Sequence, residues 1–487
     1  MFAQILIDNH VQIKKMKKQI LLLVLIVSAL TSFAAGGYKI KFNFKQLNEG
    51  TIKLAYYYGD KQYVKDTAIV DKTGKVEFSG KEDLPAGIYL VVFPSTKYFE
   101  ILVDKEQKFT VDVDTTDLIF GVKINGSKDN VDFYQYLQDI NKTQKDGEKL
   151  KKQMDEASSE KDKATIKAQL TELEKEYKNI KTRFIDQHPD ALLSKVFKAA
   201  YEPEIPEAPL LANGKKDSTF AYRYFKFHYF DQIDMKDERL IRSPVLANKV
   251  KTYMEKLTPQ IPDSINKAAD FVIGLSDGKN ELYKWLVYWI TNNYEKSNMM
   301  GMDAVFVHMA KEYYLSGKAY WIDTAQQNKI RKRVSDLEPN LIGKKATNLK
   351  LLKPDFHQIQ LYDLKSTYTI LYFWDPSCGH CQKITPKLLE FYDAYKKEFD
   401  LEVLAVYTET DTTEWFKTIK EKKLIWINAG DLLWNTNFKK YYDIYSTPVI
   451  YVLDRQKKII AKRIDVEQLP DFLRNHKKFE ATKIQTQ

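Results

Sequence analysis

The sequence predicts a multidomain protein with an N-terminal β-sandwich, an α-helical middle and a C-terminal α/β domain. Polar and apolar residues alternate between turn signals over residues 38–125, as in short strands. Near residue 127 the spacing of the apolar residues changes to the three- and four-residue steps of a helix. From about residue 340, strand-type and helix-type runs follow one another. A chain of 487 residues is long enough for two to four domains.

The first region carries the pattern of a small all-β domain. The alternation is clearest in three segments, at residues 39–44, 75–78 and 108–113. Turn-forming residues punctuate the region, at 48–50, 71–74 and 85–87. Short strands with regularly spaced turns are typical of a sandwich, so we predict a β-sandwich domain over residues 36–126.

A heptad seam follows this domain. Apolar residues recur at alternating steps of four and three, at Ile166, Leu170, Leu173, Tyr177, Ile180 and Phe184. Residues 131–154 can form an antiparallel partner that turns near Ser158, which predicts a helical hairpin over residues 127–200. Only three heptads are visible, so an intramolecular arm is favoured over a dimerising coiled coil.

A second helical domain is predicted over residues 201–338. It opens with a Pro/Glu-rich linker at residues 202–209 and continues with aromatic-rich helical segments. The aromatic run 282–290 and the methionine cluster 299–302 could form a ligand groove. Large apolar residues at helical spacing more often form core, and we expect core here.

The N-terminus has the pattern of a secretory signal peptide, assigned to residues 1–35. Four lysines between residues 14 and 18 precede an apolar run at 20–30. Residues 31–36 then include small side chains, as at a signal-peptidase cleavage site. The alternative is a membrane anchor, but the run has about half of the roughly 20 residues that a span needs. We therefore expect a periplasmic chain without a stable membrane span after cleavage. No cysteine lies near the predicted cleavage site, which excludes a lipid anchor attached to cysteine.

The charge pattern does not indicate a nucleic-acid partner. The formal net charge is +10, but lysines and acidic residues are interspersed along the whole chain. No dense basic stripe with interleaved aromatic residues is present, so no nucleic-acid binding is expected.

The chain has only two cysteines, Cys378 and Cys381, in the sequence Cys-Gly-His-Cys. They follow an apolar strand-type run at residues 369–374 and open a helical pattern. A disulfide between them would close a very short loop and add little to the stability of the fold. A redox-active role therefore explains the two cysteines better than a structural crosslink does. A zinc site lacks further ligands at suitable spacing, and no metal is expected. The free N–H groups and the dipole of the helix N-terminus would favour a Cys378 thiolate.

Three separated motifs resemble the thioredoxin fold, in its exported TlpA/ResA-type branch. They are Phe373-Trp374 followed by the dithiol, Pro386 five residues after Cys381, and Thr447-Pro448 before a late strand. The resemblance covers a thioredoxin-like domain over residues 339–487. Strands are expected there at 369–374, 401–407, 424–427, 448–453 and 458–463, and helices at 378–397, 413–422 and 468–478. The two upstream regions resemble modules of uncharacterised function.

The resemblance implies an enzyme, a thiol–disulfide oxidoreductase. Its partners would be exported client proteins with cysteines, together with a possible membrane thiol that donates or accepts electrons. Cys378 would attack the client and Cys381 would resolve the mixed disulfide. The redox-active disulfide Cys378–Cys381 would serve in place of any other cofactor. The direction of electron flow stays open.

The resemblance also assigns supporting roles around the dithiol. Gly379 would keep the first helical turn free of side-chain bulk, and a cationic His380 would favour the Cys378 thiolate. Trp374 would support the site from the end of the strand. Pro386 would kink the helix. A cis Pro448 would lie against the dithiol and leave the backbone of Thr447 free for a client.

One departure from the family pattern concerns the buried acid that many thioredoxins have six positions before the first cysteine. Tyr372 stands there, and Asp375 or Glu409 is an alternative proton acceptor. Ser377 also replaces the usual aromatic residue before the first cysteine.

Two other functions remain open. One is a non-enzymatic binding or scaffold protein in which the upstream domains are the working surfaces. The other is a peroxiredoxin-like thiol peroxidase, although the proline–threonine–cysteine signature of that group is absent around Cys378.

Overall fold

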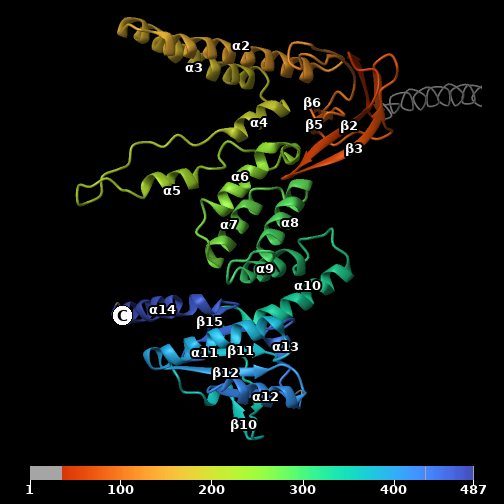
Figure 1. Cartoon of the computed structure of the whole chain (residues 1–487). Coiled ribbons are helices and arrows are strands. Elements are labelled where there is room, and N and C mark those ends of the chain that lie inside the picture. Colours follow the sequence, from red (N-terminus) through yellow and green to blue (C-terminus); the bar gives the residue numbers. More distant parts are fainter. Residues whose placement is uncertain (1–35, 434, 486–487) are drawn as a thin grey trace, which may run out of the picture. The chain divides into compact units, whose positions relative to one another are not determined.

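The computed structural model describes residues 36–433 and 435–485 (Figure 1). The chain forms two compact units, Met1–Lys251 and Thr252–Gln487. The predicted signal peptide at residues 1–35 lies outside the described residues. None of the helices in the described ranges combines the length and the apolar character that crossing a bilayer requires.

The first unit begins with two four-stranded sheets, which confirms the predicted β-sandwich. One sheet has the order β4-β1-β7-β8 and the other β3-β2-β5-β6. The strands are β1 Lys39–Lys45, β2 Thr51–Tyr58, β3 Lys61–Ile69, β4 Lys75–Ser79, β5 Gly87–Val92, β6 Tyr98–Val103, β7 Lys108–Asp114 and β8 Val122–Asn125. Buried and exposed residues alternate along β1, β4 and β7, as the sequence predicts. Phe42 of β1 packs edge-on against Phe99 of β6, which joins the two sheets.

A long helical hairpin follows the sandwich, made of α2 Lys128–Glu156 and α3 Glu160–Gln187 (Figure 1). The heptad residues of α3 are buried or half-buried and their neighbours are mostly exposed, because the seam packs on α2. Ser127 and Ser159 cap the helices through their side chains. The buried Asn130 side chain donates to the Leu102 carbonyl oxygen and accepts from its N–H, both at 2.7 Å, and so fixes the hairpin to β6.

Shorter helices complete the first unit. They are α4 Leu192–Ala200, α5 Phe220–Phe227, the 3₁₀ helix η1 Glu238–Arg242 and α6 Pro244–Glu255, which extends into the second unit. The segment between α4 and α5 is irregular apart from one isolated bridge between Leu210 and Lys216. Its prolines remove the backbone donors that regular structure needs.

The second unit begins with a helical layer. Its helices are α7 Pro262–Gly274, α8 Glu281–Glu295, α9 Asp303–Met309, the π-helical turn η2 Ala310–Leu315, α10 Thr324–Leu337 and the 3₁₀ helix η3 Glu338–Asn340. Most of the aromatic run in α8 is buried, as predicted, but Tyr288 is 57% exposed.

An α/β domain with a seven-stranded mixed sheet completes the chain. The strand order is β10-β9-β13-β12-β11-β14-β15. The strands are β9 Lys350–Leu352, β10 Gln358–Gln360, β11 Tyr368–Trp374, β12 Leu401–Tyr407, β13 Ile427–Gly430, β14 Val449–Leu453 and β15 Ile459–Lys462. The helices are η4 Leu361–Asp363, α11 Gly379–Phe399, α12 Thr412–Lys422, α13 Phe438–Tyr441, η5 Val466–Gln468 and α14 Leu469–Gln485.

Both faces of the sheet are covered, which explains why every residue of β11 is buried. Ile370, Tyr372 and Trp374 pack against residues of α11, α12 and α14. Leu371 and Phe373 point to the opposite face and pack against residues of α13 and the β9 region.

The predicted strand at residues 424–427 is wrong in position. The observed strand β13 begins at Ile427, and residues 424–426 form a turn after α12. The buried Asn428 side chain donates to the carbonyl oxygens of Leu424 and Trp426, both at 3.1 Å. These two bonds satisfy backbone acceptors within the turn, so the buried apolar residues there need no strand partner.

Candidate active site

The sheet register brings the dithiol and the Thr447–Pro448 peptide to one edge of the α/β domain. Phe373 of β11 pairs with Val449 of the antiparallel strand β14. Residues that follow β11 therefore lie beside residues that precede β14. The Thr447–Pro448 peptide bond is cis.

Cys378 lies at the N-cap of α11 and is partly exposed. The Asp375 carboxylate shapes the preceding loop, because it accepts from the Ser377 N–H at 2.9 Å and from the Ser377 hydroxyl at 2.6 Å. The Cys378 N–H donates to the Asp375 carbonyl oxygen at 3.1 Å. The Cys378 thiol itself donates to the carbonyl oxygen of Thr447 at 3.2 Å. The sulfur thus lies between a helix N-terminus and the cis-proline loop.

The pKa of the Cys378 thiol lies below its ordinary value. Burial alone raises this pKa, but hydrogen bonds to the sulfur outweigh that effect. The donors are the Thr447 side chain, the backbone N–H groups of His380 and Cys381, and the Cys381 thiol. These groups favour the charged thiolate, which is the nucleophilic form of cysteine.

Cys381 lies one helical turn deeper and is only 1% exposed. Burial, together with the neighbouring Cys378 sulfur, raises the pKa of Cys381 to about 11. Both cysteines are free thiols. The site therefore combines an accessible sulfur that ionises readily with a buried sulfur that stays protonated.

Alkylation of the reduced protein is expected to proceed in two separate steps as the pH rises. A lowered pKa means that the Cys378 thiolate forms below pH 9.0, its ordinary midpoint, whereas Cys381 becomes reactive only near pH 11. The rate of iodoacetamide labelling, followed by mass spectrometry, gives both midpoints. A Cys381→Ala variant isolates the first step, and the urea-unfolded chain supplies the reference midpoint. A single midpoint shared by both sulfurs would contradict the pKa assignment.

The other predicted residues surround the dithiol in different ways. His380 is exposed in the first turn of α11. A Cβ added to Gly379 would meet no atom of the described chain, so this glycine leaves open space beside Cys378 rather than relieving a clash. The helix continues through Pro386 to Phe399. Trp374 is buried and stacks on Tyr372 with 6.0 Å between ring centroids, and its indole N–H has no acceptor within the described residues.

The two carboxylates considered from the sequence as a substitute for the missing buried acid each have another partner. The Asp375 carboxylate accepts from Ser377, and Glu409 pairs with Lys439 at 3.4 Å. The role of either residue as proton acceptor for Cys381 stays a prediction. Tyr372 shares a 2.8 Å hydrogen bond with the Thr385 hydroxyl, which donates to the Cys381 carbonyl oxygen at 2.7 Å. Burial raises the pKa of Tyr372 far above its ordinary value, so this residue stays neutral.

The structure also shows a cluster of ions behind the cis-proline loop that the sequence analysis missed. The buried Asp443 carboxylate accepts from Arg333 of α10 at 2.6 Å and from Arg463 at 3.1 Å. In addition, the hydroxyl of Tyr445 donates to Asp336 of α10 at 3.1 Å. These contacts attach the loop before Pro448 to the helical layer of the same unit. Arg333 and Asp443 are far apart in the chain, and no local pattern could have joined them.

Within residues 36–433 and 435–485, no group of three or more His, Cys, Asp or Glu side chains is arranged to hold a metal ion.

A dithiol at the first turn of a helix, after an inner strand of a mixed sheet and against a cis-proline loop, defines a thioredoxin-like domain. Residues 342–462 match the AhpC/TSA family. The chain is a thioredoxin-like thiol–disulfide oxidoreductase that carries additional N-terminal domains. Residues 38–133 and 141–340 match two families described as domains of unknown function, DUF4369 and DUF5106.

Several relatives and solved structures match part of the chain. A thiol-disulfide oxidoreductase ResA of Bacillus cereus is 29% identical over 145 residues, which are 28% of this chain and 80% of the relative. A solved domain of a possible thiol-disulfide isomerase from Cytophaga hutchinsonii is 46% identical, with 29% of this chain and 97% of that chain covered and a TM-score of 0.28. A thioredoxin-like protein from Bacteroides caccae is 19% identical, with coverages of 56% and 99% and a TM-score of 0.44.

Proposed function

We propose that this protein exchanges disulfides with cysteine-containing client proteins through Cys378 and Cys381, in the periplasm. The main supporting observation is the contrast between the two thiols. Cys378 is accessible and has a lowered pKa, whereas Cys381 is buried and has a raised one. Such a pair suits a nucleophile with a resolving partner, because attack needs an accessible thiolate and resolution needs only the neighbouring sulfur.

Reduction of a client disulfide takes two steps. The Cys378 thiolate attacks one client sulfur, the client S–S bond breaks, and the departing client thiolate takes up a proton. Cys381 then loses its proton and attacks the Cys378 sulfur, which releases the second client thiol. The protein ends with a Cys378–Cys381 disulfide and the client with two thiols. Oxidation of a client dithiol is the same sequence in reverse.

The cis-proline loop supplies the surface on which a client strand would lie. The Thr447 carbonyl oxygen contacts the Cys378 thiol, and Thr447 and Pro448 are both partly accessible. By resemblance to thioredoxins, the backbone of Thr447 pairs with an extended client segment. The open space at Gly379 admits that segment, and the exposed His380, when cationic, favours the attacking thiolate. Trp374 and Pro386 shape the strand end and the helix around the dithiol.

Export rests on the composition of residues 1–35, a basic segment followed by a short apolar run and small residues. In the periplasm, a membrane thiol protein is the candidate electron donor or acceptor. Insulin reduction and oxidative refolding of a scrambled substrate, measured on the mature chain, distinguish a reductase from an oxidase or isomerase.

A Cys381→Ala variant is expected to accumulate stable mixed disulfides with its clients. Cys378 still attacks, but no neighbouring sulfur can release the client. After expression in the source cell, affinity purification under acid quench and non-reducing electrophoresis should show thiol-sensitive adducts. The matched control is the double variant Cys378→Ser/Cys381→Ala, which should show none. Equal adducts from both variants, or adducts from neither, would exclude client exchange through Cys378. Faster consumption of hydrogen peroxide than of client disulfides would favour a peroxidase instead.

A further inference from the structure

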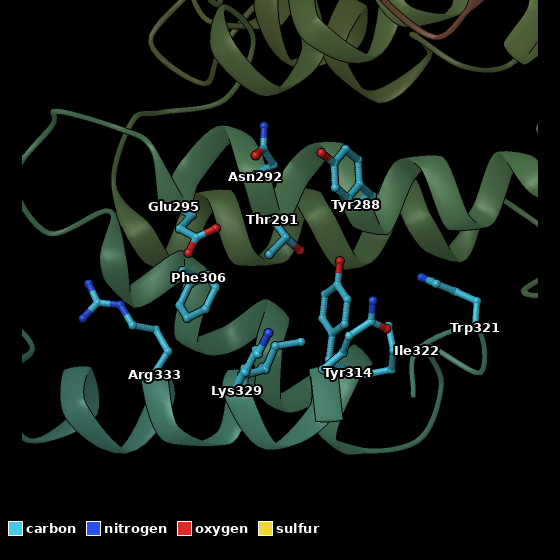
Figure 2. Close-up of a pocket in the computed structure, with 12 residues that line it drawn as sticks. Tyr288, Thr291, Asn292, Glu295, Phe306, Tyr314, Trp321, Ile322, Lys329 and Arg333 are labelled. Carbon is cyan, nitrogen blue, oxygen red and sulfur yellow. The ribbon is translucent and has the colours of Figure 1, made fainter. Parts of the chain in front are cut away.

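The helical layer of the second unit contains a cavity of about 630 Å³ between α8 and α10 (Figure 2). We name it the aromatic cavity, and its walls include Tyr288, Phe306, Tyr314, Trp321, Lys329 and Arg333. Figure 2 shows Trp321 at one end and Glu295 with Arg333 at the other. Aromatic walls with a few polar and charged groups of both signs are typical of ligand sites of this size.

One residue of the cavity wall, Tyr314, lies in a rare backbone conformation. Tyr314 belongs to the π-helical turn η2, Ala310–Leu315, which follows α9. Tyr313, the preceding residue, faces away and donates to Asp270 of α7 at 2.8 Å. The two adjacent tyrosines of this turn thus contact different neighbours, and Tyr314 faces the cavity. Single π turns occur frequently at functional sites.

A second cavity lies beside the aromatic cavity, nearer in the fold to the loop before Pro448. Glu295 and Arg333 line both cavities, and we name the second, of about 540 Å³, the junction cavity. The junction cavity lies between the helical layer and the cis-proline loop, with Met299 and Met300 on one side and Asp443 and Tyr445 on the other. The two cavities are therefore adjacent, and we name the pair the groove.

An accessible stretch of chain links this groove to Cys378. Tyr445 is 70% exposed, Ser446 is exposed, and Thr447 and Pro448 are partly exposed. Thr447 in turn contacts the Cys378 thiol through its carbonyl oxygen. The hydrogen bond to Asp336 and the Arg333 guanidinium over its ring hold Tyr445 beside the groove.

We propose that this groove binds an extended segment of the client polypeptide, with an aromatic side chain in the aromatic cavity and the reacting cysteine at Cys378. The inference rests on the proposed function. It adds a specificity site that lies outside the thioredoxin-like domain. The groove selects clients that carry an aromatic residue at a fixed distance from their cysteine.

The shape and the chemistry of the groove favour a polypeptide over a compact small molecule. The aromatic cavity shares wall residues with the junction cavity, the junction cavity includes Tyr445, and Thr447 contacts Cys378. An occupant that reaches Cys378 from the aromatic cavity must therefore be long. Lys329 supplies a donor and Glu295 supplies an acceptor, which match the carbonyl and N–H groups of an extended backbone. The exposed Met299 and Met300 side chains offer an adaptable apolar surface on one side of the junction cavity.

The test uses two peptide probes whose single cysteine is blocked as a mixed disulfide with thionitrobenzoate. The short probe has only alanines beside the cysteine. The long probe adds an extended arm that ends in tryptophan, and a series of such probes moves the tryptophan stepwise along either arm. The Cys378 thiolate attacks the probe's cysteine sulfur and the coloured thionitrobenzoate thiolate leaves, so its absorbance reports the second-order rate constant.

The best long probe is expected to react about tenfold faster than the short probe with the wild-type chain. Tyr288→Ala removes an exposed wall and Asn292→Trp fills the aromatic cavity, so each should remove most of this advantage. Both variants should retain the wild-type rate with the short probe. Tyr98→Ala is the matched control, because Tyr98 is a similarly exposed tyrosine of the β-sandwich.

Equal rates for the two probes, or a wild-type advantage in both cavity variants, would overturn the groove assignment. Failure of the proposed function gives a different result, since the short probe would then not react at all. In that case the groove can still be tested by calorimetry. A long probe in which serine replaces the cysteine is titrated into the protein, and its binding is measured. Binding that is lost in Asn292→Trp supports the groove assignment, and absence of binding contradicts it.

Discussion

Replacing Cys378 by serine is expected to lower disulfide exchange by at least about 10³-fold, to the level of the uncatalysed reaction. A serine hydroxyl ionises far above neutral pH, so the hydrogen bonds that favour the Cys378 thiolate have no anion to stabilise. The buried Cys381, whose pKa is raised to about 11, is neither exposed nor ionised enough to replace it. Insulin reduction and the rate of thionitrobenzoate release measure the loss.

The fold of the variant provides the control for this prediction. Serine is slightly smaller than cysteine and Cys378 is only partly buried, so the unfolding midpoint of Cys378→Ser should match that of the reduced wild type. A variant that keeps both its midpoint and its turnover would show that another group performs the exchange.

Replacing Asp443 by alanine is expected to destabilise the second unit by about 3 kcal/mol. The buried carboxylate is the shared partner of Arg333 and Arg463, and its loss separates α10 from the cis-proline loop. The backbone at Asp443 has φ of +51°, a left-handed conformation that alanine adopts poorly. A looser loop moves Thr447 away from Cys378, so exchange should slow as well.

Tryptophan fluorescence makes this prediction specific to one unit. All seven tryptophans of the chain lie between residues 285 and 434, so urea unfolding followed by fluorescence reports the second unit alone. Asp443→Asn keeps an acceptor oxygen and tolerates the left-handed backbone, so its loss should be smaller. Glu414→Ala breaks an exposed pair with Lys417 and should leave the midpoint unchanged. An unchanged midpoint in Asp443→Ala would contradict the role given to the ion cluster.

Features encoded in neighbouring residues could be predicted from the sequence. The strands β1, β4 and β7 follow strict alternation because one face of each is buried. The α3 seam is visible because every fourth or third residue packs on α2. The dithiol at a strand-to-helix junction and the proline before a late strand are also local signals, and in the structure the Cys378 thiol contacts the carbonyl oxygen of Thr447, the residue before the cis proline.

Other features depend on contacts that no local pattern contains. Residues 424–427 are apolar enough for a strand, but side-chain hydrogen bonds from Asn428 hold the first three in a turn. The Arg333–Asp443 pair joins residues 110 positions apart. Tyr288 belongs to an aromatic run that reads as core, yet the packing of α8 leaves it open to the aromatic cavity. Hydrogen bonds of one side chain decided the first of these outcomes, and packing against distant elements decided the other two.

The central claim is that Cys378 and Cys381 form one reversible redox couple. Its most direct test is a redox titration of the mature chain in glutathione buffers of defined ratio, with acid quench and mass counting of alkylated thiols. The two thiols are expected to disappear together, with the slope of a two-electron couple, and to return on reduction. Thiols that stay fully alkylated at every ratio, or that are lost one at a time to glutathione adducts, would contradict the account.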